Sequence, residues 1–412
     1  MSDVRPFRAL RPRPDLAARV AAPPYDVINS EEAREMAKGN DVSFLHINKP
    51  EIDLGPDVSL YDDRVYAKGV ANLRRFIAEG VFVREAEPRF YVYQQRMGDH
   101  VQAGIVGAAS CQEYADGLIK RHEFTRKDKE DDRTRHTHEL NANAGPVFLT
   151  YRKRAEIDAV VDGIRKGEPL YDIVTDDGIG HTVWLVSPGE TVALQQALRA
   201  VPALYVADGH HRAASAARVG LERRASNPRH RGDEPYNYFL AVLFPHDQLR
   251  IMDYNRVVRD LNALPPESFL AAVGKTFTVT PTAEPRPDAV HRFGMYLGGR
   301  WYRLEAKPGT FPAGDPVRSL DAAILQENLL APVLGIADPR TDTRVDFVGG
   351  IRGLEELEKR VAGGWAAAFA LFPVSLEQLM AVADAGLVMP PKSTWFEPKL
   401  RSGLLVRTLD TW

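Results

Sequence analysis

The chain has 412 residues and a formal net charge of −3, with 44% hydrophobic and 26% charged residues. A globular chain of this length typically forms about two or three domains, and its slight acidic excess argues against nucleic acid or an anionic membrane as a partner. The one cysteine, Cys111, excludes an intrachain disulfide framework. Because no run of about 18 apolar residues occurs, we expect no membrane span and a cytoplasmic protein.

The first part of the sequence is predicted to mix helices with a hairpin. In chain order the expected elements are helices near 30–38 and 61–79, a hairpin over 89–110, a polar segment at 120–145 that ends as a helix, and a strand at 146–151. The hairpin is predicted because two alternating apolar runs flank Gly98 and Asp99, a pair of residues that favours a tight turn.

The remainder continues the same mixture. The expected elements are a hairpin at 171–187, a helix at 190–200, a strand before a helix from Gly209, strands within 236–258, a strand at 275–281, a hairpin at 294–306, and then helix, strand and helix. Hairpins among helices predict an α+β fold rather than a doubly wound parallel sheet. We predict one region over 1–260, containing the HEFTR and ADGHHR motifs, and a C-terminal α+β region over 261–412 that contributes MPPKSTWFEPK.

Three common catalytic motifs are incomplete. The tripeptide GKT at 274–276 resembles the end of a P-loop, but Phe269 stands where the earlier glycine belongs, and a strand follows instead of a helix. His122 and Glu123 begin an HExxH zinc motif, yet Arg126 occupies the position of its second histidine. No Gly-x-Ser-x-Gly nucleophile elbow occurs. These observations argue against a P-loop kinase, an HExxH metalloprotease and an α/β-hydrolase.

The stretch VADGHHRAAS, residues 206–215, combines the parts of an anion site at a helix start. We expect Asp208 to be the helix N-cap and Gly209 to give the turn and let a ligand approach closely. The first helical turn offers unpaired N–H groups, and Arg212 adds donors that fit phosphate oxygens. His210 and His211 point in different directions, so at most one faces the ligand of Arg212. The alternative is that Asp208 only caps the helix while Arg212 pairs with a surface carboxylate.

The charged segment at 121–139 places cations at helical spacing. Arg126, Lys129, Arg133 and His136 follow one another at intervals of three, four and three, which puts them on one face of a helix. We expect this basic stripe to converge on the cleft of Arg212 and to bind phosphate. The alternative is a solvated helix with many i,i+4 ion pairs.

Two carboxylates are candidates for acid–base chemistry. Glu123, just before the stripe, would stay ionised and could take a hydroxyl proton, orient a substrate amine, or hold magnesium. Asp26, in the stiff loop APPYDVI, is its rival, and its alternative role is that of a turn residue. A metal cluster of His122, His136 and His138 is a further possibility, but no close ligand spacing supports it.

The segment MPPKSTWFEPK near the C-terminus places hydroxyls and lysines around two aromatic residues. Lys392, Ser393, Thr394 and Lys399 suit phosphates or a carboxylate, and Trp395 could cover a nucleotide base. An equally good alternative is a terminal strand anchored by the two aromatic side chains.

The sequence resembles a known family in motifs that span nearly all of it. ADGHHRAAS resembles the phosphate-binding box of the ParB/sulfiredoxin-like superfamily, in which a Gly-x-x-Arg type turn opens a helix and holds nucleotide phosphates. The whole chain resembles a bacterial and archaeal domain-of-unknown-function family, number ten-fifteen, through PFRALRP, VAAPPYDVI, SFLHINKPEIDL, KRHEFTRKDKEDDR, YVADGHHRAAS, MDYNRVVRDLN, TDTRVDFVGG and MPPKSTWFEPK. ParB-like relatives include free-serine kinases. The resemblance implies that region 1–260 has a ParB-like core and binds an ATP-type nucleotide through Gly209, His210, His211 and Arg212. It does not identify the catalytic base.

Two hypotheses of function follow. The first is a kinase that transfers phosphate from ATP or a related nucleotide, with Mg²⁺, to a small hydroxyl metabolite, L-serine being favoured by the resemblance. In it Glu123 or Asp26 takes the proton, Asp208 helps with the metal, and the site cations are Arg126, Lys129, His211 and Arg212. The second is a regulatory protein that binds or hydrolyses nucleotide without kinase activity. DNA binding is disfavoured by the slight negative net charge and by the lack of a convincing helix-turn-helix motif. The identity of the phosphoryl donor and the formation of a homo-oligomer stay open.

Overall fold

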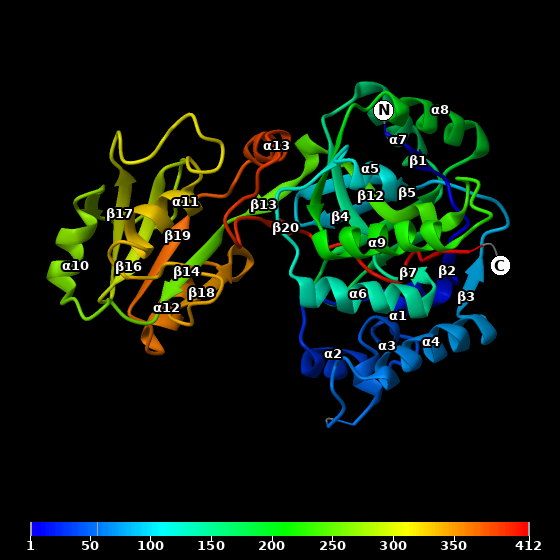
Figure 1. The fold of residues 1–412 in the computed structure, drawn as a ribbon, viewed down its shortest axis with the longest axis horizontal. Coiled ribbons are helices and arrows are strands. Elements are labelled where there is room, and N and C mark those ends of the chain that lie inside the picture. Colours follow the sequence, from blue (N-terminus) through cyan, green and yellow to red (C-terminus); the bar gives the residue numbers. More distant parts are fainter. Residues whose placement is uncertain (1, 56, 411–412) are drawn as a thin grey trace. The chain divides into compact units, whose positions relative to one another are not determined.

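The computed structural model describes residues 2–55 and 57–410, and the chain divides into two compact units (Figure 1). Unit 1 comprises Met1–Leu249 and Pro398–Trp412, and unit 2 comprises Arg250–Glu397. Both units combine helices with sheets, so the α+β class predicted from the sequence is confirmed. The division differs from the predicted boundary at 260, because unit 2 begins at Arg250 and the last segment of the chain returns to unit 1.

A large mixed sheet forms the centre of unit 1. Across the sheet its strands are β6 (Ile119–Lys120), β11 (Leu204–Asp208), β8 (Val147–Tyr151), β12 (Tyr238–Pro245), β5 (His100–Ser110), β4 (Tyr91–Met97), β10 (Gly180–Leu185) and β9 (Tyr171–Val174), with β1 (Val4–Arg5) also paired to β5. Two pairs, β8 with β12 and β6 with β11, are parallel, and the others are antiparallel. The predicted hairpins at 89–110 and 171–187 are the pairs β4–β5 and β9–β10.

The helices of unit 1 pack in two groups. The main core joins the sheet to α5 (Cys111–Ala115), α7 (Ala155–Ile164), α8 (Pro188–Arg199) and α9 (His210–Ser226). A second core gathers α1 (Ala17–Val20), α2 (Ser30–Ala37), α3 (Leu45–Asn48) and α4 (Asp63–Ala78) around Phe44 and Phe76. Between the groups lies α6 (Lys127–Leu140), which contacts both α4 and α9 (Figure 1).

The predicted helix near 30–38 is α2, and its N-cap is Asn29. The Asn29 side chain accepts from the Glu32 N–H at 2.9 Å, and the Glu32 carboxylate accepts from the Asn29 N–H at 2.8 Å. This reciprocal pair satisfies two amides that have no partner inside the helix, which explains where α2 begins.

The C-terminal segment of the chain holds together parts of unit 1 that are distant in sequence. β21 (Arg407–Thr408) of this segment pairs with β7 (Ala142–Asn143). In the first part of the chain, β2 (Leu10–Pro12) pairs with β3 (Phe82–Arg84). Single bridges join Ser402 to Ala22 and Val406 to Leu10. The segment that begins at Pro398 is thereby fixed against the N-terminal part of the chain.

Unit 2 is built on an antiparallel sheet of its own. In order its strands are β15 (Phe277–Pro281), β17 (Arg300–Ala306), β16 (Arg292–Leu297), β19 (Ala367–Leu371), β14 (Tyr254–Val258) and β18 (Val345–Gly349), and a separate ribbon pairs β13 (Arg250–Met252) with β20 (Trp395–Glu397). Its helices are α10 (Pro266–Val273), α11 (Asp321–Leu325), α12 (Glu355–Ala362) and α13 (Leu376–Asp384). The predicted hairpin at 294–306 is β16–β17, with Gly298 and Gly299 at φ 57° and 79° in the turn. No helix in the described residues is both long and apolar enough to cross a membrane.

Candidate functional site

The turn between β11 and α9 requires glycine at position 209. Gly209 has φ 86° and ψ 36°, a left-handed conformation that other residues adopt only with strain. A Cβ at this position would also lie 3.0 Å from the Nε atom of Arg212, so the guanidinium group lies directly over the turn. Gly209, and not Asp208 as predicted, is the N-cap, and no side chain caps α9. The reason is that Asp208 still belongs to β11, where its carboxylate accepts from the Gly209 N–H at 2.9 Å.

Arg212 is a buried cation between two carboxylates. It is 9% exposed, and its Nη2 atom lies 3.8 Å from a carboxylate oxygen of both Asp26 and Asp208. Its Nη1 donates to the Pro146 carbonyl, whereas its buried Nε has no hydrogen-bond partner among the described residues. Burial acts to lower the pKa of Arg212, but the carboxylates of Asp26 and Asp208 raise it overall. The guanidinium therefore stays charged, and its buried Nε donor is unused.

Asp208 links this cation to a lysine from the C-terminal segment. The Nζ of Lys399 lies 3.2 Å from its Oδ2 atom. Burial alone would raise the pKa of Asp208, but Lys399 and then Arg212 lower it, so the carboxylate stays ionised. Asp26, Arg212, Asp208 and Lys399 thus form a row of alternating charges at the start of α9. Of the lysines predicted to bind phosphate, Lys399 is the one that lies in this row.

His211 brings the loop before α6 to the same helix end. Its Nε2 accepts from the Arg126 N–H at 3.0 Å, although the two residues are 85 positions apart. Burial lowers the pKa of His211, so the ring is neutral near neutral pH and carries its proton on Nδ1. The side chain of Arg126 turns to solvent and pairs with Asp128 at 2.9 Å.

Arg126, Arg133 and His136 of the predicted basic stripe each have a partner within the protein, and phosphate binding by the stripe stays a prediction. Arg133 pairs with Asp132 at 2.7 Å and lies 4.3 Å from the centre of the Tyr25 ring. His136 is buried, bonds through Nε2 to the Ile47 carbonyl at 3.0 Å, and has its pKa lowered to about 4 by burial. Lys129 is half-buried, and the described residues contain no ion pair for it. Arg126 and Arg133 are paired locally, because acidic residues stand two positions and one position away from them.

Arg133, His136 and Arg212 nevertheless line one small cavity beside α9. Its volume of about 30 Å³ is sufficient for one or two water molecules. The convergence predicted for the stripe therefore holds for Arg133, but the cavity is too small to contain a nucleotide.

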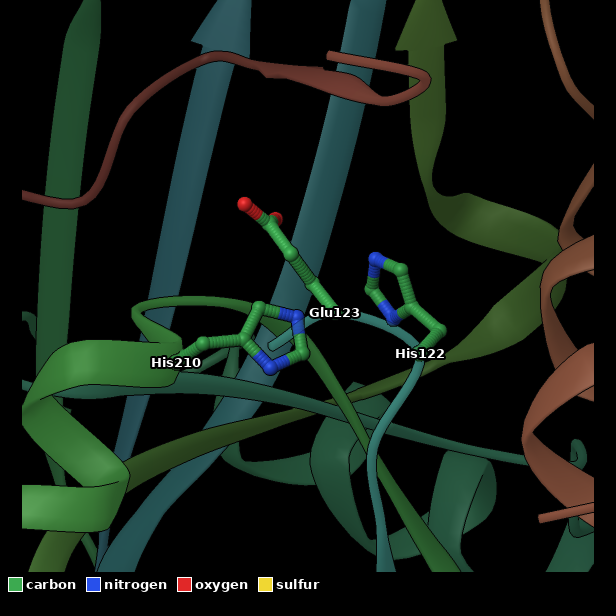
Figure 2. A group of neighbouring side chains, drawn as sticks. All are labelled: His122, Glu123 and His210. Carbon is green, nitrogen blue, oxygen red and sulfur yellow. The ribbon is translucent and has the colours of Figure 1, made fainter. Parts of the chain in front are cut away.

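A second group of polar side chains meets at the first residue of α9 (Figure 2). His122 and Glu123 come from the loop between β6 and α6, and His210 is the start of α9; their ligating atoms all lie within 4.8 Å of one another. The rings of His122 and His210 are 4.5 Å apart and nearly perpendicular. Both histidines are buried, and neither ring nitrogen of His210 has a hydrogen-bond partner among the described residues.

Burial keeps both imidazoles of this group neutral. It lowers the pKa of His122 to about 4 and, together with the neighbouring His122, lowers that of His210. Two neutral imidazoles and a carboxylate are a donor set that suits zinc or another transition metal, whereas magnesium prefers oxygen ligands alone. The group thus fits Mg²⁺ poorly, and Asp208, the residue predicted to help hold it, pairs instead with Lys399.

The sequence could not identify this group because 88 positions separate His122 from His210. The signals present were the His-Glu pair and the double histidine, and nothing in the local sequence connects them. The cluster of His122, His136 and His138 does not form: His136 bonds to Ile47, and His138 pairs with Glu222 at 3.0 Å.

The segment MPPKSTWFEPK is divided between the two units. Lys392, Ser393 and Thr394 lie in unit 2, where Ser393 donates to the Pro390 carbonyl at 2.7 Å, while Lys399 lies in unit 1. Trp395 begins β20, so part of this segment is a strand, while phosphate binding by Lys392, Ser393 and Thr394 stays a prediction. The division explains why these residues cannot be treated as one site within either unit.

Comparison with known proteins gives a family and distant structural similarities. The family model described as "Protein of unknown function (DUF1015)" matches residues 4–323. No curated protein matches the chain. Similar solved structures include a free serine kinase in complex with AMP, with 12% identity over 74% of this chain and 91% of that chain at a TM-score of 0.38. Others are SbnI with C-terminal truncation from Staphylococcus aureus (11%, 73% and 87%, TM-score 0.38) and a conserved hypothetical protein from Pyrococcus furiosus (12%, 74% and 95%, TM-score 0.35). Identities and TM-scores this low do not transfer an activity.

Proposed function

This chain belongs to the family described as "Protein of unknown function (DUF1015)", and because that description assigns no activity, we propose one from the site at the start of α9. The protein is a nucleotide-dependent phosphotransferase that acts on a small hydroxyl metabolite, with L-serine as the preferred acceptor. The observation that carries the proposal is the uncapped first turn of α9 with the buried, incompletely bonded guanidinium of Arg212 above it. The choice of serine rests on the resemblance of the motifs to ParB-like free-serine kinases.

Phosphate binding at this helix end follows from charge and hydrogen-bonding capacity. The first-turn amides of α9 point outward with the positive end of the helix dipole, which favours an anion. Arg212 is held only loosely by Asp26 and Asp208, at 3.8 Å, so a phosphate that forms charge-assisted bonds competes well for it. Lys399 and the Nδ1–H of His211 are further donors at the same end of the helix.

Transfer to a serine hydroxyl requires a base, because the neutral hydroxyl is a poor nucleophile. Glu123 lies beside His210 and Asp26 lies beside Arg212, so a carboxylate flanks each side of the first turn. Glu123 is the proposed base, and Asp26, whose carboxylate lies 3.8 Å from the Arg212 guanidinium, is its rival. Magnesium that enters with the nucleotide would neutralise phosphate charge during transfer. To bind this magnesium, Asp208 would have to release its ion pair with Lys399.

The proposal is tested by phosphorus NMR of the full chain with Mg²⁺, L-serine and either ATP or ADP. A signal of O-phosphoserine is expected. Arg212→Ala should weaken nucleotide binding by on the order of 2 kcal/mol, about thirtyfold, because a charge-assisted contact is lost. Arg218→Ala is the matched control, since Arg218 lies on the same helix but pairs with Asp131 at the surface. Unchanged nucleotide affinity in a folded Arg212→Ala protein would refute the site.

The second candidate is a regulatory protein that binds or hydrolyses nucleotide without phosphorylating a metabolite. The pairing of Asp26 and Asp208 with cations favours it, because a carboxylate that balances a cation is a poor proton acceptor. Nucleotide binding or hydrolysis without any phosphorylated serine would select this function. If no nucleotide binds, both functions are excluded.

A further inference from the structure

Unit 2 contains a cavity that the proposed function does not use. Its volume is about 250 Å³, and its wall includes Arg256 of β14, Gln326 and Leu330 of the π-helical turn Gln326–Leu330, Phe347 of β18, Pro391, and Arg340. Sites for drug-sized ligands and nucleotides commonly span about 300–1,000 Å³. A cavity of this volume therefore suits a small metabolite, and every residue named belongs to unit 2.

The floor of the cavity is a buried cation without a counter-ion. Arg256 is 4% exposed and donates to the carbonyls of Tyr254 and of Pro391, the latter at 3.3 Å, while its guanidinium lies 5.3 Å from the centre of the Phe347 ring. Among the described residues no carboxylate forms an ion pair with it. Burial lowers the pKa of Arg256 to about 10, so the group is still charged at neutral pH. A guanidinium has five N–H donors, and two are engaged. An unpaired buried charge is unfavourable, and an anion in the cavity would relieve it.

The wall of the cavity adds an unused acceptor. The Nε2 of Gln326 donates to the Ile336 carbonyl at 2.7 Å, and this bond fixes the orientation of the amide. Its buried Oε1 has no hydrogen-bond partner among the described residues. The acidic residue that lines the same cavity, Asp338, pairs with Arg340 at 3.0 Å and does not neutralise Arg256. The cavity thus presents one free cationic donor group and one free acceptor.

We propose that unit 2 binds a small hydroxy acid or amino acid in this cavity, with the carboxylate on Arg256 and the hydroxyl or ammonium group donating to Gln326 Oε1. A carboxylate accepts two parallel bonds from a guanidinium, which matches the donors left on Arg256. The second group on the ligand satisfies the amide oxygen, whose burial without a partner is otherwise costly. This binding uses no residue of the α9 site and does not depend on the phosphotransferase activity.

Calorimetry of the full chain with glycolate, glycine and acetate tests the proposal. We expect glycolate or glycine to bind about tenfold more tightly than acetate, the effect of one additional buried hydrogen bond. Arg256→Met should abolish binding of all three. Arg300→Met is the matched control, because Arg300 is an exposed arginine of unit 2 outside the cavity and its loss should change nothing.

Two further measurements keep the test decisive. Arg256→Met should unfold at the same or a higher temperature than the wild type without ligand, since it removes an uncompensated buried charge. If it misfolds, Gln326→Met retains Arg256 and should bind acetate normally while losing the preference for glycolate or glycine. The proposal fails if the wild type binds none of the three acids, or if binding is lost in Arg212→Ala but kept in Arg256→Met, which would assign the anion to unit 1.

Discussion

Glu123 is the residue on which the two candidate functions differ most. Glu123→Gln keeps the shape of the side chain but removes its basicity, so turnover should fall about a hundredfold or more while nucleotide affinity is retained. Steady-state kinetics and calorimetry on one preparation measure both quantities. Asp26→Asn is the comparison variant. If Asp26→Asn abolishes turnover and Glu123→Gln does not, the base is Asp26.

The metal content of the same variants tests whether Glu123 is a metal ligand rather than the catalytic base. Its carboxylate and the nitrogens of His122 and His210 lie within 4.8 Å of one another. Elemental analysis after incubation with Zn²⁺ is therefore needed beside the kinetics. A Glu123→Gln protein that loses both metal and turnover identifies Glu123 as a ligand rather than the base.

The turn before α9 requires glycine at position 209, and any other residue is unfavourable there. Gly209→Ala should destabilise the protein by about 1–2 kcal/mol, because alanine resists the left-handed conformation and its Cβ would press on Arg212. Gly189→Ala is the matched control: Gly189 lies in the first turn of α8, and a methyl group added there would have no atom within 4 Å, so alanine should be neutral or slightly stabilising. Urea unfolding measures both changes, and equal effects would contradict the strain at Gly209.

At the scale of elements, α6 is held by surface ion pairs to α9 and by a buried hydrogen bond to α3. Arg218 of α9 pairs with Asp131 of α6 at 2.6 Å, but the two side chains are 42% and 40% exposed. His136 of α6 is buried and bonds to the Ile47 carbonyl. The surface pairs orient the helices, and the buried contact should contribute more to stability.

Two substitutions compare these contributions. Arg218→Ala should cost no more than about 1 kcal/mol, as exposed pairs do. His136→Ala should cost on the order of 2 kcal/mol or more, because it leaves a cavity and a buried carbonyl without its donor. Denaturant unfolding gives both values. A larger loss from Arg218→Ala would mean that the ion pairs, and not the buried contact, hold α6 in place.

At the scale of the whole molecule, the two units are expected to respond to pH in opposite directions. In unit 1, burial lowers the pKa of His136 to about 4, and burial with the nearby Arg401 lowers that of His181 to about 3. Unfolded histidines take up protons below about pH 6.5. The unfolded state then binds more protons than the folded one, so these groups reduce the stability of unit 1 as pH falls from about 6.5 to about 4.

Asp321 gives unit 2 the opposite dependence. Burial raises the pKa of this carboxyl from 3.8 to about 7, although hydrogen bonds from the backbone of His291 and Phe372 act against the rise. Between these values the folded state holds a proton that the unfolded state has lost. The stability that this proton confers is complete near pH 4 and disappears as pH rises to about 7.

Hydrogen exchange, corrected for its intrinsic pH dependence, resolves the two units. Between about pH 5 and 7, protection of β12 in unit 1 should rise and that of β19 in unit 2 should fall. Asp321→Asn keeps the oxygen that accepts from the His291 N–H at 2.8 Å but cannot titrate, so it should remove the fall in unit 2 and leave unit 1 unchanged. A parallel response of both units in the wild type would contradict the assignment.

The sequence by itself determined the family, the α+β class, the helices α2, α4 and α8, the hairpins β4–β5 and β16–β17, and the glycine turn that opens α9. These features depend on apolar periodicity, turn residues and caps, which act between residues a few positions apart. Only the tertiary structure decided the partners of the charged and polar side chains. Lys399 meets Asp208 across 191 positions, His210 meets His122 and Glu123, and Arg133 of α6 pairs with Asp132. The physical reason is that a charge or imidazole can be satisfied by any suitable group that packing brings within a few ångströms, and local sequence does not specify which group that will be.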